Sequence, residues 1–152
     1  MASVPVIDLG SARGGDRAAR LAIASTIDAT CREIGFFAIT GHGIPDSLVE
    51  DLRGRAVAGE TLASANDAPA PPDLKEFFHV GPVDVSGDAY YTGALGRRHF
   101  EPNLWPAAPA GFERSATAYY RAMSGLIVSL MRLAALALDV EEGFFDDKVN
   151  RS

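Results

Sequence analysis

The sequence has little cysteine, little histidine and fewer positive than negative charges. Its 152 residues include one cysteine, Cys31, which has no partner for an internal disulfide. A chain of this kind is typical of a reducing, cytoplasmic setting. Fourteen Lys and Arg residues stand against 20 Asp and Glu residues, which gives a net charge of −6. This balance argues against nucleic acid and against an anionic membrane surface as partners.

Several common signatures are also missing. We find no run of about eighteen apolar residues and no basic, then apolar, leader at the N-terminus, so we expect neither a membrane span nor a signal peptide. The sequence has no Gly-X-Ser-X-Gly, no P-loop and no glycine-rich dinucleotide fingerprint. A length of 152 residues with 47% hydrophobic residues is nevertheless enough for one domain with a real core.

The three histidines do not form a recognisable metal set. They are His42, His79 and His99, and only His99 has an acidic residue, Glu101, at His-X-acid spacing. A facial triad also needs a second, distant histidine, and none follows His99. His42 falls in a glycine turn, where a histidine more often bonds nearby backbone. The residues alone therefore predict no catalytic, cofactor-binding or metal-ligating group.

The N-terminal third is rich in regular elements. Asp16 is a good N-cap for a helix over 17–33, on whose apolar face we place Cys31 as a small buried hydrophobe. The aromatic and β-branched run at 35–40 predicts a buried strand at the core of a sheet. The remaining expectations are a short strand over 4–9, a polar loop over 10–15, a glycine turn at 41–43 and a helix that begins at Pro45.

The rest of the chain alternates between irregular and strongly patterned segments. Residues 59–72 are linker-like, and residues 73–82 predict an apolar strand with Lys75 and His79 on one face and Phe78 on the other. That strand is either a wall of a pocket or a solvated edge. Further on we expect an irregular stretch over 83–98, an extended and packed aromatic segment over 101–106, a long helix over 111–138 with a wide apolar stripe, and a short helix within 141–149.

Several motifs, in order along nearly the whole chain, resemble a known family. They are Val4-Pro5-Val6-Ile7-Asp8-Leu9, Ile34-Gly35-Phe36-Phe37, Gly41-His42-Gly43-Ile44-Pro45, the segment 73–82, Asn103-Leu104-Trp105-Pro106, Tyr119-Tyr120 and Phe144-Phe145-Asp146. Together they are similar to the N-terminal region of the non-haem iron(II), 2-oxoglutarate-dependent oxygenases, in the isopenicillin N synthase-like group.

The resemblance implies an α+β fold, in which helices and short strands flank a double-stranded β-helix (jelly-roll) barrel that is largely absent from this chain. It implies an enzyme that uses Fe(II) and 2-oxoglutarate to oxidise a small molecule, or that cyclises one oxidatively without 2-oxoglutarate. The family's His-X-Asp, distal His and Arg-X-Ser lie downstream of the matched region. No catalytic, metal or cosubstrate residue can therefore be assigned, and Lys75, Phe78 and His79 are the substrate-pocket candidates.

The chain also departs from the family after the helix that begins at Pro45. An aromatic pair, a Leu-Pro and an Arg-Gly-Tyr loop are expected there, but the sequence passes directly to Gly59-Glu60. We therefore expect residues 1–152 to be a single, incomplete N-terminal domain that lacks a segment near 57–60 and the C-terminal catalytic barrel, its partner. The alternative is a non-catalytic helical binding module derived from such an enzyme. An isolated flank should expose apolar surface and self-associate.

Overall fold

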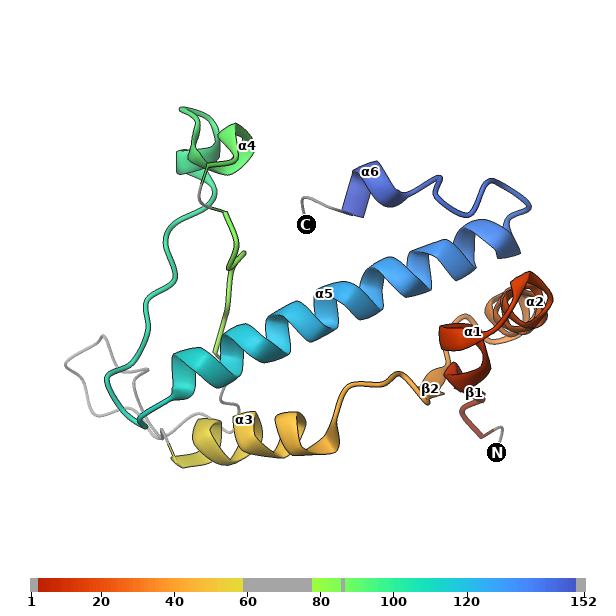
Figure 1. The fold of residues 1–152 in the computed structure, drawn as a ribbon, viewed down its shortest axis with the longest axis horizontal. Helices are drawn as coiled ribbons and strands as arrows, with labels where there is room; N and C mark the ends of the chain where they lie inside the picture. The colour runs from red at the N-terminus through yellow and green to blue at the C-terminus, as the bar shows by residue number, and fades with distance from the viewer. Residues whose placement is uncertain (1–2, 59–77, 86, 150–152) are drawn as a thin grey trace. The chain divides into compact units, whose positions relative to one another are not determined.

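The computed structural model describes residues 3–85 and 87–149, except for 59–77. These residues form short strands, helices and extended segments (Figure 1), and they divide into two compact units, Met1–Ile44 with Met123–Ser152 and Pro45–Ala122. The first unit is called the aliphatic unit below and the second the aromatic unit. The elements are β1 (Val6–Asp8), α1 (Gly10–Gly14), α2 (Arg17–Glu33), β2 (Ala38–Thr40), α3 (Asp46–Ala58), α4 (Ala89–Thr92), the 3-10 helix η1 (Gly96–Arg98), α5 (Phe112–Ala137) and α6 (Asp146–Val149).

The aliphatic unit contains a parallel sheet of β1 and β2 with Ile7 opposite Ile39. The strand expected over 4–9 is confirmed, though it is shorter. The strand expected over 35–40 is present, but the expectation was wrong in two respects, because β2 covers only 38–40 and is not buried. Phe36 beside it is 58% exposed. A sheet with its core on one side buries only alternate residues, and here those are Ile7 and, in part, Ile39.

Helix α2 confirms the helix expected over 17–33. It begins where the Ala19 N–H donates to Asp16 Oδ1 at 2.9 Å. Cys31, however, is exposed, which corrects the expectation that it is buried. Steps of four residues rotate by about 40° each around a helix of 3.6 residues per turn. Cys31, two such steps beyond Ile23, has therefore turned away from the core. That core consists of Ile7, Leu9, Ile23, Ile27 and Leu133.

The segment 10–15 was expected to be a loop, yet residues Gly10–Gly14 form the short helix α1. Its first N–H is satisfied locally, since Gly10 donates to Asp8 Oδ1 at 2.8 Å. The same carboxylate lies against the next glycine turn. A Cβ added at Gly41, where φ is +62°, would lie 2.0 Å from Asp8 Oδ1. The chain therefore requires glycine at this crossing.

Helix α5 is the longest element, and it confirms the helix expected over 111–138. Its C-terminal part belongs to the aliphatic unit, where Leu133 and Leu136 are buried. The short helix expected within 141–149 is confirmed only for 146–149, as α6. Arg132 of α5 donates to Asp146 of α6, with Nη2 and Oδ2 2.9 Å apart. This pair fixes the segment that follows α5 in Figure 1.

Among the described residues, α5 alone has the length and composition of a helix that could cross a membrane. From the sequence we expected no membrane-spanning segment. Core helices of soluble proteins have the same composition, and here Leu133 lies in the aliphatic core with Ile23 and Ile27. The structure thus accounts for part of the apolar surface of α5 by packing within the protein.

Candidate functional site

The segment with two of the three pocket candidates is extended but is not a strand. Residues 78–82 have no strand partner among the described residues, so the strand expected over 73–82 was wrong in its described part. Pro82 has no N–H with which to continue a ladder. Phe78 and His79 are both exposed, and Lys75 lies outside the described residues.

A side chain takes the place of the missing strand partner. The Gly81 N–H donates to Asn103 Oδ1 at 2.7 Å, and Asn103 Nδ2 donates to the Gly81 carbonyl at 3.1 Å and to the Pro82 carbonyl at 3.3 Å. An amide is the neutral side chain that offers an acceptor and two donors at once. Asn103 therefore satisfies both backbone groups of Gly81, as a neighbouring strand would.

Aromatic rings hold the same segment at Phe78. Its ring centroid lies 4.9 Å from that of Phe112 in an edge-to-face contact and 6.2 Å from that of Trp105 in a stacked one. Such ring pairs contribute about 0.5–1.5 kcal/mol each beyond the area they bury. Phe78 remains 45% exposed, so one part of its ring is anchored and another faces outward. The packing expected for the aromatic segment 101–106 is confirmed at Trp105.

The N-terminal end of α5 is fastened to α3 by a polar cluster. Asp51 accepts hydrogen bonds from Arg55 and from the Ser115 hydroxyl, and Ser115 is buried. Arg55 also donates to the Ala110 carbonyl, just before α5 begins. The hydrogen bonds from Arg55 and then from Ser115 lower the pKa of the Asp51 carboxyl. Phe112, the first residue of α5, is held close to this cluster.

A cavity of about 680 Å³ opens beside Asn103 and Trp105 in the aromatic unit. Arg121 on its wall pairs with Asp84, with Nη2 and Oδ1 2.6 Å apart, and this hydrogen bond lowers the pKa of the Asp84 carboxyl. The wall thus carries both an apolar surface and a fixed ion pair. Its lining includes Pro82, Val83, Tyr91, Arg97, Phe100, Glu101, Asn103, Trp105, Glu113, Thr117 and Arg121.

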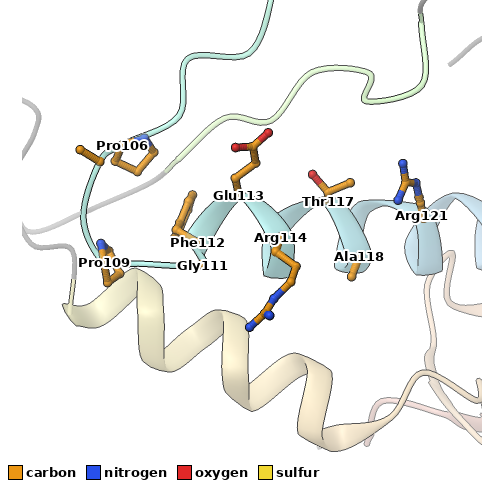
Figure 2. A pocket seen from close by; sticks show the side chains of 10 residues that line it. Pro106, Pro109, Gly111, Phe112, Glu113, Arg114, Thr117, Ala118 and Arg121 are labelled. Carbon is orange, nitrogen blue, oxygen red and sulfur yellow. The ribbon is translucent and has the colours of Figure 1, made fainter.

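A second, open cavity of about 520 Å³ lies along the first turns of α5. Figure 2 shows Glu113, Thr117 and Arg121 on the side of α5 that faces away from α3, and Arg114 on the side toward α3. Glu113, Thr117 and Arg121 also line the 680 Å³ cavity, so the two hollows share one face of the helix. That face carries polar groups of both signs.

The described residues do not fit an iron site. No three His, Cys, Asp or Glu side chains in the described part of the chain are grouped to hold a metal ion. His42 Nδ1 accepts a hydrogen bond from the Ile44 N–H at 3.1 Å, which is the backbone role expected of a turn histidine. His99 and Glu101 are both exposed and belong to no such group. No step of a reaction is therefore assigned to a metal held here.

Sequence reasoning missed the two polar links that build this region. Asn103 was recognised only as part of an aromatic motif, and its partner Gly81 lies 22 residues away. Ser115 and Asp51 are 64 residues apart. For the hydrogen bond between Ser115 and Asp51, the available signal was a serine on an otherwise apolar helix face. No local pattern indicates the hydrogen bonds between Asn103 and Gly81.

Comparisons with known proteins agree on one family. The family model described as non-haem dioxygenase in morphine synthesis, N-terminal, matches residues 4–60. A 2-oxoglutarate-Fe(II) type oxidoreductase, hxnY of Emericella nidulans, is 32% identical over 168 residues, covering 93% of this chain and 48% of its own length. Isopenicillin N synthase of Streptomyces clavuligerus is 31% identical over 165 residues, covering 95% of this chain and 50% of its own length.

Solved structures show the same fold at lower identity. A C-terminally truncated protein of Neurospora crassa, crystallised in its apo form, superposes with a TM-score of 0.75 and 21% identity, over 97% of this chain and 57% of that one. A putative 2OG-Fe(II) oxygenase family protein from Caulobacter crescentus gives a TM-score of 0.74 and 16% identity, over 96% of this chain and 52% of that one.

The described residues form a helix-rich fold with a small parallel sheet, and the solved structures above share this fold. The chain belongs to the non-haem iron(II), 2-oxoglutarate-dependent oxygenase superfamily and matches its N-terminal region, with isopenicillin N synthases among its relatives. It spans about half the length of the curated relatives it matches.

Proposed function

We propose that this chain is the N-terminal flank of an iron(II)- and 2-oxoglutarate-dependent oxygenase that oxidises a small molecule. One observation carries the proposal: more than nine-tenths of this chain aligns with only about half of each curated relative. The relatives include a validamycin A dioxygenase of Streptomyces hygroscopicus, 26% identical over 96% of this chain. The other half of such an enzyme would then be the jelly-roll barrel, which would hold Fe(II) and 2-oxoglutarate.

The aligned lengths support one further part of the proposal. The alignment with hxnY runs over 168 residues and that with the Streptomyces clavuligerus synthase over 165, both more than the 152 residues of this chain. The relatives therefore have residues in this region that the chain lacks. We propose that they fall near 57–60, where the family motifs break off, and residues 59–77 lie outside the described part.

Phe78, His79 and Lys75 are the residues we propose for the wall of the substrate pocket. Phe78 supports this role because its ring is anchored by Phe112 and Trp105 on one side and exposed on the other. His79 is exposed next to it. Histidine and lysine side chains can both donate hydrogen bonds to a carboxylate, so His79 and Lys75 would meet a substrate carboxylate while Phe78 packs on an apolar part.

The exposed apolar residues of α5 support the proposal that the barrel is this chain's partner. Ile127 is 44% exposed, although it lies in the long apolar stripe. Apolar surface left open in a flank promotes association. We expect the chain on its own to self-associate, which light scattering would detect, and we propose a cytoplasmic location for the whole enzyme.

Reading the gene past codon 152 tests the proposal most directly. We expect a His-X-Asp, a later His and an Arg-X-Ser in the same frame. The protein from that whole frame should develop the weak visible band of the Fe(II)–2-oxoglutarate complex under anaerobic conditions, and the 152-residue chain should not. A stop codon at 153, together with a monomeric chain that unfolds cooperatively, would instead favour a non-catalytic binding module.

A further inference from the structure

Asn103 holds residues 78–82, which carry the pocket candidates Phe78 and His79, by hydrogen bonds that require a side-chain amide. Its side chain accepts from Gly81 N–H at 2.7 Å and donates to the carbonyls of Gly81 and Pro82 at 3.1 and 3.3 Å. The contact is partly buried, so each lost hydrogen bond would leave a backbone group poorly solvated. An isosteric carboxylate could accept but not donate, and a leucine could do neither.

The same short segment also holds the ring of Phe78. Trp105 follows Asn103 by two residues and stacks on Phe78 with ring centroids 6.2 Å apart. Residues 103–105 thus contact residues 78–82 at two points, one polar and one aromatic. Residues 78–82 have no strand partner among the described residues, so these two points, together with the contact of Phe78 with Phe112, help to hold the segment.

We infer that Asn103 is a positioning residue, which fixes Phe78 and His79 so that they can receive a small molecule with an apolar group and a carboxylate. The inference rests on the pocket role proposed above for Phe78 and His79. Asn103 itself is turned toward the backbone of Gly81 and Pro82, so it acts through the segment and needs no contact with the ligand.

Trp105 is the only tryptophan of the chain, and its ring lies against those of Phe78 and Phe112, with centroids 6.2 and 6.4 Å away. Its near-ultraviolet circular dichroism and its quenching by acrylamide therefore report on how these rings are packed. Three variants of the full chain separate the explanations: Asn103→Asp, Asn103→Leu and, as a control, Leu104→Ala. Leu104 is 86% exposed and adjacent, so its loss should leave the Trp105 signal unchanged. Asn103→Leu should weaken the dichroic signal and raise quenching at every pH.

Asn103→Asp gives the sharper readout because its effect should depend on pH. At neutral pH the introduced carboxylate faces two carbonyl oxygens, and the Trp105 signal should resemble that of Asn103→Leu. Those carbonyls favour the protonated acid, which raises the pKa of the introduced carboxyl above the ordinary value of about 3.9. Acidification should therefore restore the signal at a pH where the wild-type signal is still constant. A general loss of packing would show no such recovery.

Phenylacetate, which has one aromatic ring and one carboxylate, is the ligand probe. We expect it to bind the full chain at neutral pH and to bind Asn103→Leu about tenfold more weakly, the order expected when a buried backbone group is left unpaired. Unchanged Trp105 signals in both Asn103 variants would overturn the positioning role. Altered Trp105 signals with equal phenylacetate affinity would overturn its link to the pocket. The Fe(II)–2-oxoglutarate band of the whole-frame protein is read separately, so its absence would count against the proposed function alone.

Discussion

Different interactions stabilise the interior of each of the two units. The aliphatic unit has a core of Ile, Leu and Ala side chains on regular elements, and its helix α2 was expected from the spacing of its apolar residues. The aromatic unit contains the one tryptophan and all four tyrosines. Between α3 and α5, its described residues form only the short helices α4 and η1 and irregular segments. There, side chains such as Asn103 and Asp51 bond partners far along the chain.

This difference separates support from candidate chemistry. Burial of aliphatic side chains is non-directional and tolerates exchange of similar volumes, whereas hydrogen-bonded polar links require particular atoms at particular places. The candidate pocket residues Phe78 and His79 lie in the aromatic unit, where specific hydrogen bonds hold the irregular segments. Substitutions should accordingly act on global stability in the aliphatic unit and on local geometry in the aromatic unit.

The largest effect should come from a cavity in the aliphatic core. Leu133 is 4% exposed and packs with Ile23 and Ile27. Leu133→Ala should lower the free energy of unfolding by about 2–5 kcal/mol, because both transfer energy and packing contacts are lost. Urea denaturation followed by far-ultraviolet circular dichroism measures this loss.

Leu138→Ala provides the matched control for this change. Leu138 lies just beyond α5 and is 60% exposed, so the same truncation removes little buried surface. Its cost should be much smaller than that of Leu133→Ala. Equal costs at the two positions would mean that the aliphatic core does not determine the stability of this unit.

A backbone effect of intermediate size is expected at the glycine turn. Gly41→Ala puts alanine at a position with left-handed backbone angles, which costs about 1–2 kcal/mol. The added Cβ would also lie against Asp8 Oδ1 and the Gly10 nitrogen. Gly35→Ala is the control, because Gly35 also has a positive φ but nothing lies within 4 Å of its added Cβ. Thermal unfolding should show the larger loss for Gly41→Ala, and the reverse order would contradict the crowded turn.

The same contrast explains how far the sequence could predict the structure. Helices α2 and α5 and the strand at Ile7 follow from local periodicity and from the Asp16 cap, which involve neighbours a few residues apart. The exposure of Cys31 was missed because a stripe repeated every four residues drifts around the helix. An element's type was therefore easier to predict than the depth at which its residues lie.

The candidate site was predictable only in part. Phe78 and His79 were proposed as pocket candidates from their pattern and the family resemblance, and this stays a prediction. The strand assigned to them is absent in the described residues. The link that replaces it depends on Asn103 and Gly81, 22 residues apart, and no local pattern records such a pairing. Side-chain substitutes for strand pairing depend on tertiary position, which single-sequence patterns do not contain.

A smaller effect, a gain in the free energy of unfolding rather than a loss, should be equal in the two units. Gly54 in α3 and Gly125 in α5 have open space around an added Cβ. Gly54→Ala and Gly125→Ala should each raise the free energy of unfolding by about 0.8–1.0 kcal/mol through helix propensity. Urea denaturation measures both gains. A gain in one variant and a loss in the other would show that the two units respond differently even where packing does not intervene.

The smallest effect concerns pH, and it contrasts one carboxyl of each unit. Hydrogen bonds lower the pKa of Asp51, mainly from Arg55 and then from Ser115, and of Asp146, mainly from Arg132. A folded-state pKa below the unfolded value of about 3.9 means that the stabilisation is complete above that pH and is lost as the pH falls further. Ser115→Ala removes one donor to Asp51, so the acid-induced loss should shrink in the aromatic unit, followed by Trp105 fluorescence. As the control, hydrogen exchange in α2 of the aliphatic unit should depend on pH in the same way in the wild type and in Ser115→Ala. If the substitution also changed the pH dependence of exchange in α2, the hydrogen bond between Ser115 and Asp51 would affect more than the aromatic unit.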